Sequence, residues 1–176
     1  MNRVWTLCVV TLLLCCAAQP KAEAANWDSW RFLLGKWTGK ASGQPGEGTG
    51  TFSFRFELQG KILVRRNRDD FPATKERAAF SHEDLLVIYP ETGGPRTRAI
   101  YFDNEGHVIH YTAEFFEDKN TLIFLSDPAP SAPRFRLSYT KGENGSLVIG
   151  FAIAPPGKPE AFSTHVEGAA RRQQAP

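Results

Sequence analysis

About ten short stretches with the composition of β-strands, separated by turns rich in Gly, Pro, Asn and Asp, fill almost the whole chain after residue 35. In the clearest stretch, Phe52, Phe54 and Phe56 alternate with polar residues. A period of two is typical of a strand that buries one face. Most stretches are joined by a few residues, so neighbours in sequence should pair as antiparallel strands. The stretches are residues 36–41, 49–58, 62–68, 84–89, 96–103, 107–116, 121–126, 134–140, 146–152 and 162–171.

A long open sheet would leave edge strands that pair with other chains, so we expect the strands to close into a barrel. Before the first strand, Trp27, Trp30, Leu33 and Leu34 recur at spacings of three and four. This spacing predicts one short helix over residues 26–34, which ends at Gly35. One helix and no strand–helix–strand unit exclude a doubly wound sheet. The predicted fold class is therefore all-β: an antiparallel up-and-down barrel of about ten strands with a short N-terminal helix.

The first 24 residues have the features of a secretory signal peptide. A basic start is followed by an apolar run over residues 6–18 that is too short to span a membrane, and then by the small-x-small site Ala22-Glu23-Ala24. We therefore expect a signal peptide over residues 1–24 and one lipocalin-like barrel domain over residues 25–176, exported to the periplasm or secreted. A lipoprotein is the minor alternative, because Leu14 before Cys15 is a poor match to the small residue that normally precedes a lipidated cysteine.

Cysteine content and charge exclude several functions. All three cysteines lie in the leader, so the expected mature chain has no disulfide, thiolate metal site or cysteine nucleophile. The 21 Lys and Arg nearly balance the 19 Asp and Glu, which argues against nucleic acid as a partner. The one cationic cluster, residues 65–68, is interpreted as a charged strand end.

The segment WRFLLGKWTG, residues 30–39, resembles the opening of the calycin superfamily, where a short helix precedes a Gly-x-Trp on the first strand. Through LQGK at residues 58–61 and YFDNEG at residues 101–106, the chain is similar to a bacterial family of lipocalin-like domains of unknown function. It resembles nitrobindin-like domains more distantly. In calycins the Trp closes one end of the barrel under a basic residue of the last strand. The resemblance assigns this structural signature to Gly35, Trp37 and either Arg171 or Arg172.

Nitrobindins bind haem b through a histidine on the final strand, so the resemblance implies His165 as the one candidate axial ligand. Strict alternation along that strand instead places His165 with Glu167, on the more polar face. We therefore expect no cofactor, and we keep haem b as the alternative.

The remaining titratable residues do not define a metal site or a catalytic site. His82 and Asp84 share a face of a predicted strand, but two ligands do not make a metal site. The chain has no Gly-x-Ser-x-Gly motif, and we assign no catalytic residue and favour a binding protein over an enzyme. A buried acid beside a tyrosine, such as Glu114 near Tyr111 or Tyr139, stays open.

The natural functional site of a small barrel is its interior and mouth, which predicts an exported barrel that binds a small, largely apolar molecule. On an inward face, Arg66 would anchor a ligand carboxylate. Runs that are apolar on both faces, such as residues 99–102 and 147–149, suggest a homodimer through one barrel wall. The alternatives are a haem protein acting on nitric oxide or peroxynitrite, as the nitrobindin resemblance implies, an enzyme that uses a barrel-bound substrate, and a structural barrel without a ligand. The candidate cavity residues are Phe52, Phe54, Phe56, Val64, Arg66, Phe135, Leu137 and Tyr139.

Overall fold

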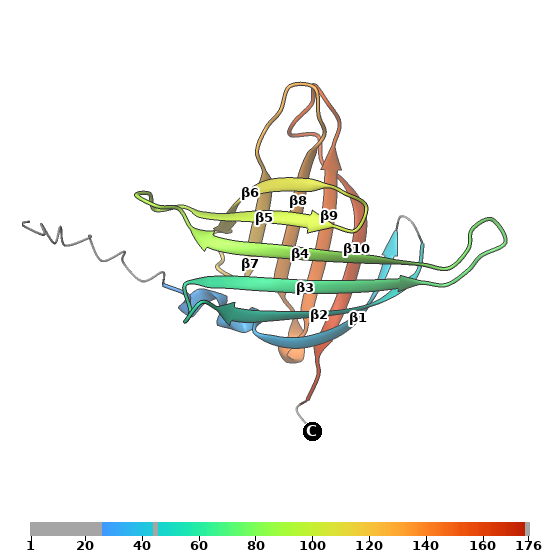
Figure 1. Ribbon diagram of the computed structural model, residues 1–176, viewed down its shortest axis with the longest axis horizontal. Coiled ribbons are helices and arrows are strands. Elements are labelled where there is room, and N and C mark those ends of the chain that lie inside the picture. Colours follow the sequence, from blue (N-terminus) through green and yellow to red (C-terminus); the bar gives the residue numbers. More distant parts are fainter. Residues whose placement is uncertain (1–25, 44–45, 175–176) are drawn as a thin grey trace, which may run out of the picture.

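The computed structural model describes residues 26–43 and 46–174, and the signal peptide predicted for residues 1–24 lies outside this range. The described chain is a closed antiparallel barrel of ten strands preceded by one short 3-10 helix (Figure 1). This confirms the predicted fold class and the presence of all ten strands. The elements are η1 (Asp28–Leu33), β1 (Gly35–Gly43), β2 (Gly48–Glu57), β3 (Ile62–Phe71), β4 (Phe80–Pro90), β5 (Thr97–Asp103), β6 (Val108–Phe115), β7 (Thr121–Ser126), β8 (Arg134–Lys141), η2 (Glu143–Gly145), β9 (Leu147–Ala154) and β10 (Ser163–Arg172).

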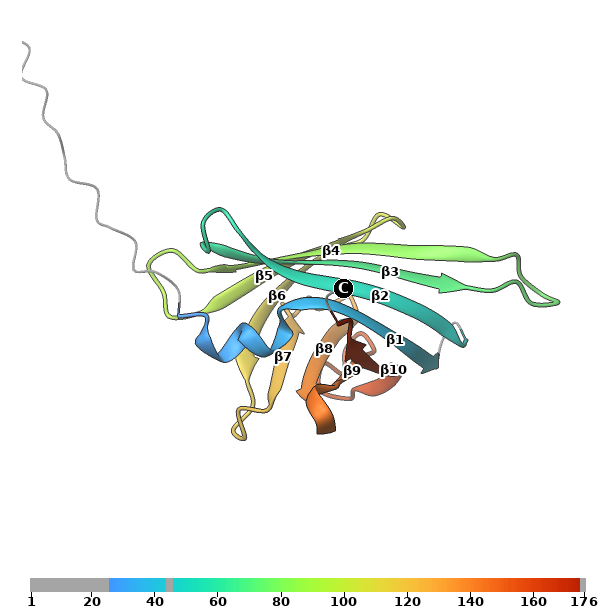
Figure 2. The ribbon, with the colours of Figure 1, turned by 90° about the horizontal axis from the view of Figure 1, so that it is seen from below.

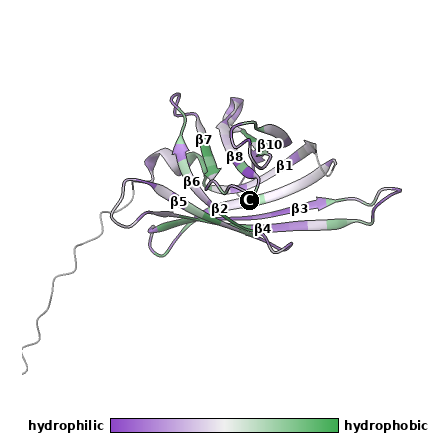
Figure 3. Ribbon diagram, turned by 90° about the horizontal axis from the view of Figure 1, so that it is seen from above, coloured by the Kyte–Doolittle hydropathy of each residue, from purple (hydrophilic) through white to green (hydrophobic). Residues whose placement is uncertain are grey.

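The strands follow one another around the barrel, and β10 pairs with β1 to close it. In Figure 1, β2 to β5 run across the front of the molecule and β8 to β10 cross behind them. The hairpin of β3 and β4 extends well beyond its neighbours (Figure 2). Single strands differ in character: β7 is coloured mainly as hydrophobic and much of β3 as hydrophilic (Figure 3).

The turn between β2 and β3 determines which residues of β3 face inward. Gly60 has a φ of 82°, in the left-handed region where glycine is favoured. The turn pairs Phe54 with Arg65, and paired residues of an antiparallel sheet share a face. Phe54 is 1% exposed and inward, so Arg65 is inward as well. Val64 and Arg66 consequently face outward, and their prediction as cavity residues was wrong.

The η1 end of the barrel is closed by aromatic side chains. Trp30 packs edge-on against Phe115 and Phe124, with ring centroids 5.6 Å and 6.1 Å away. Trp37, at 1% exposure, donates a hydrogen bond of 2.7 Å from Nε1 to the carbonyl oxygen of Leu33. Burying these rings supplies much of the apolar area that stabilises the fold.

The basic residue over Trp37 is Arg172. Its guanidinium lies 4.4 Å from the indole centroid, and its Nη2 donates to the carbonyl oxygen of Phe32 at 2.9 Å. Arg171 pairs with Thr38 in the sheet and is exposed, so its place in the predicted signature was wrong. Gly35 has a φ of 108°, and an added Cβ would meet Arg172 at 3.0 Å, so the turn into β1 favours glycine for two reasons.

Candidate ligand-binding site

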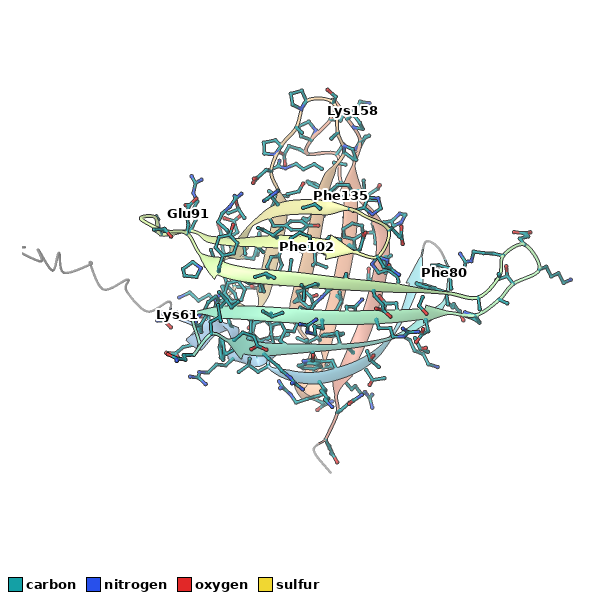
Figure 4. All side chains as sticks on the ribbon, in the orientation of Figure 1. Lys61, Phe80, Glu91, Phe102, Phe135 and Lys158 are labelled. Atoms are coloured by element: carbon teal, nitrogen blue, oxygen red, sulfur yellow. The ribbon has the colours of Figure 1, made fainter. Side chains whose placement is uncertain are left out.

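The interior of the barrel is closed at the η1 end and open at the other. Toward η1, the inward side chains of Leu63 and Ile88 are completely buried. Toward the opposite end, inward side chains such as Phe135 and Phe151 are only half-buried. Figure 4 shows Phe135 near the end from which the loop with Lys158 projects. These side chains face inward and still contact solvent at this end, and the interior and mouth are the usual place for a ligand in a barrel.

A buried ion pair stands at the centre of the interior. Arg65 on β3 and Asp84 on β4 are 6% and 9% exposed. Arg65 Nη2 donates to both carboxylate oxygens of Asp84, and Arg65 Nη1 donates to the Tyr139 hydroxyl on β8. Burial is the largest influence and acts to raise the pKa of Asp84, but Arg65 and His82 together outweigh it and the pKa is lowered. The pair is therefore ionised, and it needs these hydrogen bonds to offset the cost of removing two charges from water.

Two further polar side chains of β3 extend the network toward the open end. Asn67 Nδ2 donates to Asp69 Oδ2 at 2.7 Å and to Asp84 Oδ2 at 3.0 Å. Asp69 makes no ion pair with any residue of the described chain. Burial raises the pKa of Asp69, and the hydrogen bond from Asn67 offsets this only in part. Asp69 is thus the acid of the interior that lacks a dedicated cation.

His82 links the network to the mouth of the barrel. Its Nδ1 lies 3.0 Å from Glu105 Oε1, and its Nε2 lies 3.0 Å from the Tyr101 hydroxyl. Nε2 is also 3.6 Å from Asp84 Oδ2, which is an ion-pair distance and too long for a good hydrogen bond. Asp84, and after it Glu105, raise the pKa of His82 to about 9. His82 is therefore protonated at neutral pH, and both ring nitrogens donate.

One buried polar atom beside the ion pair lacks a partner within the described residues. Arg65 Nε is buried and has no hydrogen-bond partner there. Buried polar groups are nearly always paired, so this N–H donor calls for a water or a ligand oxygen.

The wall opposite this network is aromatic. The rings of Phe135 on β8 and Phe151 on β9 stack, with centroids 5.9 Å apart and an interplanar angle of 9°. His165 on β10 meets Phe151 edge-on at 6.1 Å. A bulge between Thr164 and Val166 interrupts the regular alternation of β10 and turns the His165 ring onto this inward phenylalanine. The prediction that His165 shares the polar face of Glu167 was therefore wrong.

The structure brings only some of the predicted cavity residues to the open half. Phe135 and Leu137 lie on the inward face of β8 toward the mouth, together with Tyr139 deeper inside. Phe52 and Phe54 also face inward but belong to the packed core, where they meet Tyr139. Phe56 is inward as well and lies against Trp27 of the closed end.

Sequence reasoning missed Arg65, Asn67, Asp69, Asp84, Tyr101 and Tyr111 as interior residues. The sequence did contain a signal for Arg65. A two-residue turn at Gln59 and Gly60 places Phe54 opposite Arg65 in the hairpin, as the structure does, and so puts Arg65 on the buried face. The buried acid near a tyrosine is Asp84, whereas Glu114 is exposed.

Arg66 instead borders a depression of about 710 Å³ on the outside of β1 to β5. Outward-facing side chains such as Lys36, Leu85 and Phe102 line much of it. Asn67 and Asp84 of the interior network also border it, but Phe135 and Phe151 do not, so we treat it as separate from the aromatic wall. Within the described chain, no group of three or more His, Cys, Asp and Glu side chains could hold a metal ion, and no helix is long and apolar enough to span a membrane.

Comparison with known proteins supports the architecture. No family model matches the sequence. No curated protein matches it. The crystal structure of Rv2717c from M. tuberculosis aligns with a TM-score of 0.56 and 15% sequence identity, covering 86% of this chain and 100% of that one. At this identity the likeness concerns the fold alone, which is a closed antiparallel barrel of ten strands.

Proposed function

We propose that this protein binds a small, largely apolar molecule in the open half of its barrel. The observation that carries the proposal is the partial exposure of inward aromatic side chains, above all Phe135 and Phe151, at the end opposite η1. Aromatic groups that face inward without being fully covered lose contact with water when an apolar ligand enters. Polar groups beside them can orient the bound molecule.

The expected anchor for a ligand carboxylate is absent from the interior, since Arg66 faces outward. The inward cation, Arg65, is already bound to Asp84 and Tyr139. The proposal therefore rests on the aromatic wall that includes Phe135 and Phe151.

Binding can be tested with a fluorescent apolar dye and two phenylalanine variants. We expect Phe151→Ala to raise the dissociation constant of the dye by roughly three- to tenfold, because an aromatic contact contributes about 0.5–1.5 kcal/mol. Phe102→Ala is the matched control, since Phe102 is 41% exposed and lies on the outer wall. It should change the constant by less than about twofold. No dye binding by the wild type, or equal effects of the two variants, would contradict the proposal.

Haem binding through His165 is the second candidate function, and the bulge in β10 is the observation in its favour. Against it, His165 makes no hydrogen bond to any residue of the described chain, whereas metal-ligating histidines are usually held by one at the other ring nitrogen. We expect haem added to the protein to give no sharp Soret band that depends on His165. A stoichiometric band that is lost in His165→Ala would make haem binding the leading function.

Export is part of the proposal and rests on the sequence of residues 1–24. We expect the exported protein to begin near Ala25, because the apolar run and the Ala-x-Ala site match a cleaved leader. Intact-mass measurement decides this, and a species that retains Met1 or carries lipid at Cys15 or Cys16 would refute it.

A further inference from the structure

One row of side chains crosses the outer face of β1 to β5. Lys36 on β1 pairs with Ser53 on β2, and Ser53 pairs with Arg66 on β3. The row continues through Leu85 on β4 to Phe102 on β5. Paired residues of an antiparallel sheet share a face, so all five side chains point away from the interior. All five border the outer depression of about 710 Å³, a volume within the range of small-molecule sites.

The first half of this row consists of donors without acceptors. Lys36 and Arg66 are exposed, and neither makes an ion pair with any residue in the described ranges. Ser53 is half-buried between them, and its hydroxyl has no hydrogen-bond partner in the described part of the chain. Neighbouring strands are about 4.8 Å apart, so the Cα atoms of Lys36 and Arg66 are separated by roughly 10 Å. Two cations therefore flank one hydroxyl at a spacing that a single carboxylate can bridge.

The acids that border the depression do not neutralise these two cations. Asp84 and Asp103 pair across β4 and β5 and face inward, where their side chains are 3% and 4% exposed. Each of the three acids has its own partner: Glu83 is paired with Arg68, Asp84 with Arg65, and Asp103 with His107. The β1 to β3 side of the depression therefore presents an excess of positive charge to the solvent.

The second half of the row is apolar and only partly covered. Leu85 is half-buried, and Phe102 is 41% exposed on the front wall (Figure 4). Val108 pairs with Phe102 and extends the row at 56% exposure. Phe102 lies two strands from Arg66, which is roughly 10 Å. The row thus combines a cationic end and an apolar end within the length of one small amphipathic molecule.

We propose that this row is a second binding site, on the outside of the barrel, for a small carboxylate with an aromatic or short apolar body. The carboxylate accepts hydrogen bonds from Lys36 and Ser53, and the guanidinium of Arg66 binds both of its oxygens. The apolar body covers Leu85 and Phe102. An amine of the same shape meets two like charges and is disfavoured. The site does not depend on the proposed function, because no residue of the aromatic wall lines it.

A matched pair of ligands tests the site. Equilibrium dialysis at neutral pH and about 0.15 M ionic strength compares naphthoate with naphthamide, which has the same aromatic body and no charge. We expect the wild type to bind naphthoate at least about tenfold more tightly, because hydrogen bonds to a charged group are about twice as strong as neutral ones. In the double variant Lys36→Gln, Arg66→Gln the two ligands should bind within about twofold of each other.

The control is the double variant Lys40→Gln, Lys61→Gln, which removes the same charge from exposed residues that do not border the depression. These lysines are four and five positions along the chain from Lys36 and Arg66, or more than about 12 Å in extended backbone. That distance exceeds the Debye length of about 8 Å, so the naphthoate affinity should change by less than about twofold.

Two phenylalanine variants separate the outer site from the interior. Phe102→Ala should raise the dissociation constant of naphthoate by roughly three- to tenfold, whereas Phe151→Ala should leave it within about twofold. A loss in Phe151→Ala alone would place naphthoate in the interior and overturn the outer site. A wild-type dimer in sedimentation equilibrium that Phe102→Ala dissociates would also overturn it, because a second copy then covers this face.

The remaining outcomes distinguish this site from the proposed function. Absence of naphthoate binding, equal binding of naphthoate and naphthamide by the wild type, or equal losses in the two double variants would overturn the outer site and leave the interior site intact. Failure of the wild type to bind the apolar dye, with the naphthoate preference retained, would contradict the proposed function and support the outer site.

Discussion

At the scale of single residues, the interior depends on an ion pair that has little contact with water. Arg65 and Asp84 come from adjacent strands, and Tyr139 from the opposite wall completes the hydrogen bonds of the guanidinium. A pair of this kind contributes little net stability compared with apolar residues of the same volume, but removing one partner leaves the other charge buried alone.

We therefore expect Arg65→Met to lower the free energy of unfolding by about 3–5 kcal/mol, since it leaves Asp84 uncompensated. The double variant Arg65→Met, Asp84→Leu should recover a large part of this loss. Arg66→Met, on the exposed outer face, is the control and should change the free energy by less than about 0.5 kcal/mol. Denaturant unfolding monitored by tryptophan fluorescence measures all three. A single variant as stable as the control would show that the pair is not buried in solution.

The raised pKa of His82 makes stability depend on pH. A folded-state pKa of about 9, above the ordinary 6.5, means that the bound proton favours the folded state. This contribution is complete below pH 6.5 and is lost as the pH rises to about 9. We expect the difference in unfolding free energy between the wild type and His82→Gln to shrink over that interval. A difference that stays constant from pH 6 to about pH 9.5 would contradict the assignment.

At the scale of elements, the turns of the barrel could be read from the sequence more safely than the faces of its strands. Gly, Asn and Asp clusters located the hairpins, and period-two alternation identified the buried face of β2. On β3 the same rule failed, because Ile62 and Val64 begin the outer face with apolar residues while Arg65 occupies the inner one. Polarity predicts the wrong face for a charged residue that is buried with a specific partner on another strand. A single sequence does not show which residue that partner is.

The bulge in β10 was unpredictable for a related reason. Nothing in the composition of residues 163–166 marks an extra residue in the strand, because a bulge is defined by the register with β9. The orientation of His165 depends on that register. Alternation along the strand alone therefore cannot predict the orientation of His165.

The junction of β1, β10 and η1 gives a prediction at this scale. Arg172→Ala removes the guanidinium from the face of Trp37 and the hydrogen bond to Phe32, and it should lower the free energy of unfolding by about 1–3 kcal/mol. Arg171→Ala should change it by less than about 0.5 kcal/mol, since Arg171 is exposed. Thermal and denaturant unfolding of the two variants measure the two free energies. An equal loss of unfolding free energy in both variants would mean that Arg171 is part of the structural signature after all.

At the scale of the whole molecule, the fold class was accessible from the sequence and the site was not. Strand number, order and closure follow from short connections and from the need to protect sheet edges, which are local and general causes. The interior network depends on contacts among β3, β4, β5 and β8, which only the closed barrel brings together. The composition of this network therefore follows from the structure rather than from the sequence pattern.

The closure of the barrel by β1 and β10 has a consequence for how quickly the chain can fold. Gln173 and Thr38 are joined by a hydrogen bond across 135 positions of sequence, whereas the other neighbouring strands are linked by short connections. Linking residue 174 to residue 26 and opening the chain at the turn near Lys158, a circular permutant, would make this pairing local and would make the pairing of β9 with β10 the most distant one instead. The mean locality of contacts stays about the same, so we expect the permutant to retain β-type circular dichroism and to refold at a rate within about threefold of the wild type. Stopped-flow refolding measures this, and a much larger change in rate would mean that one of these two strand pairings forms in the rate-limiting step.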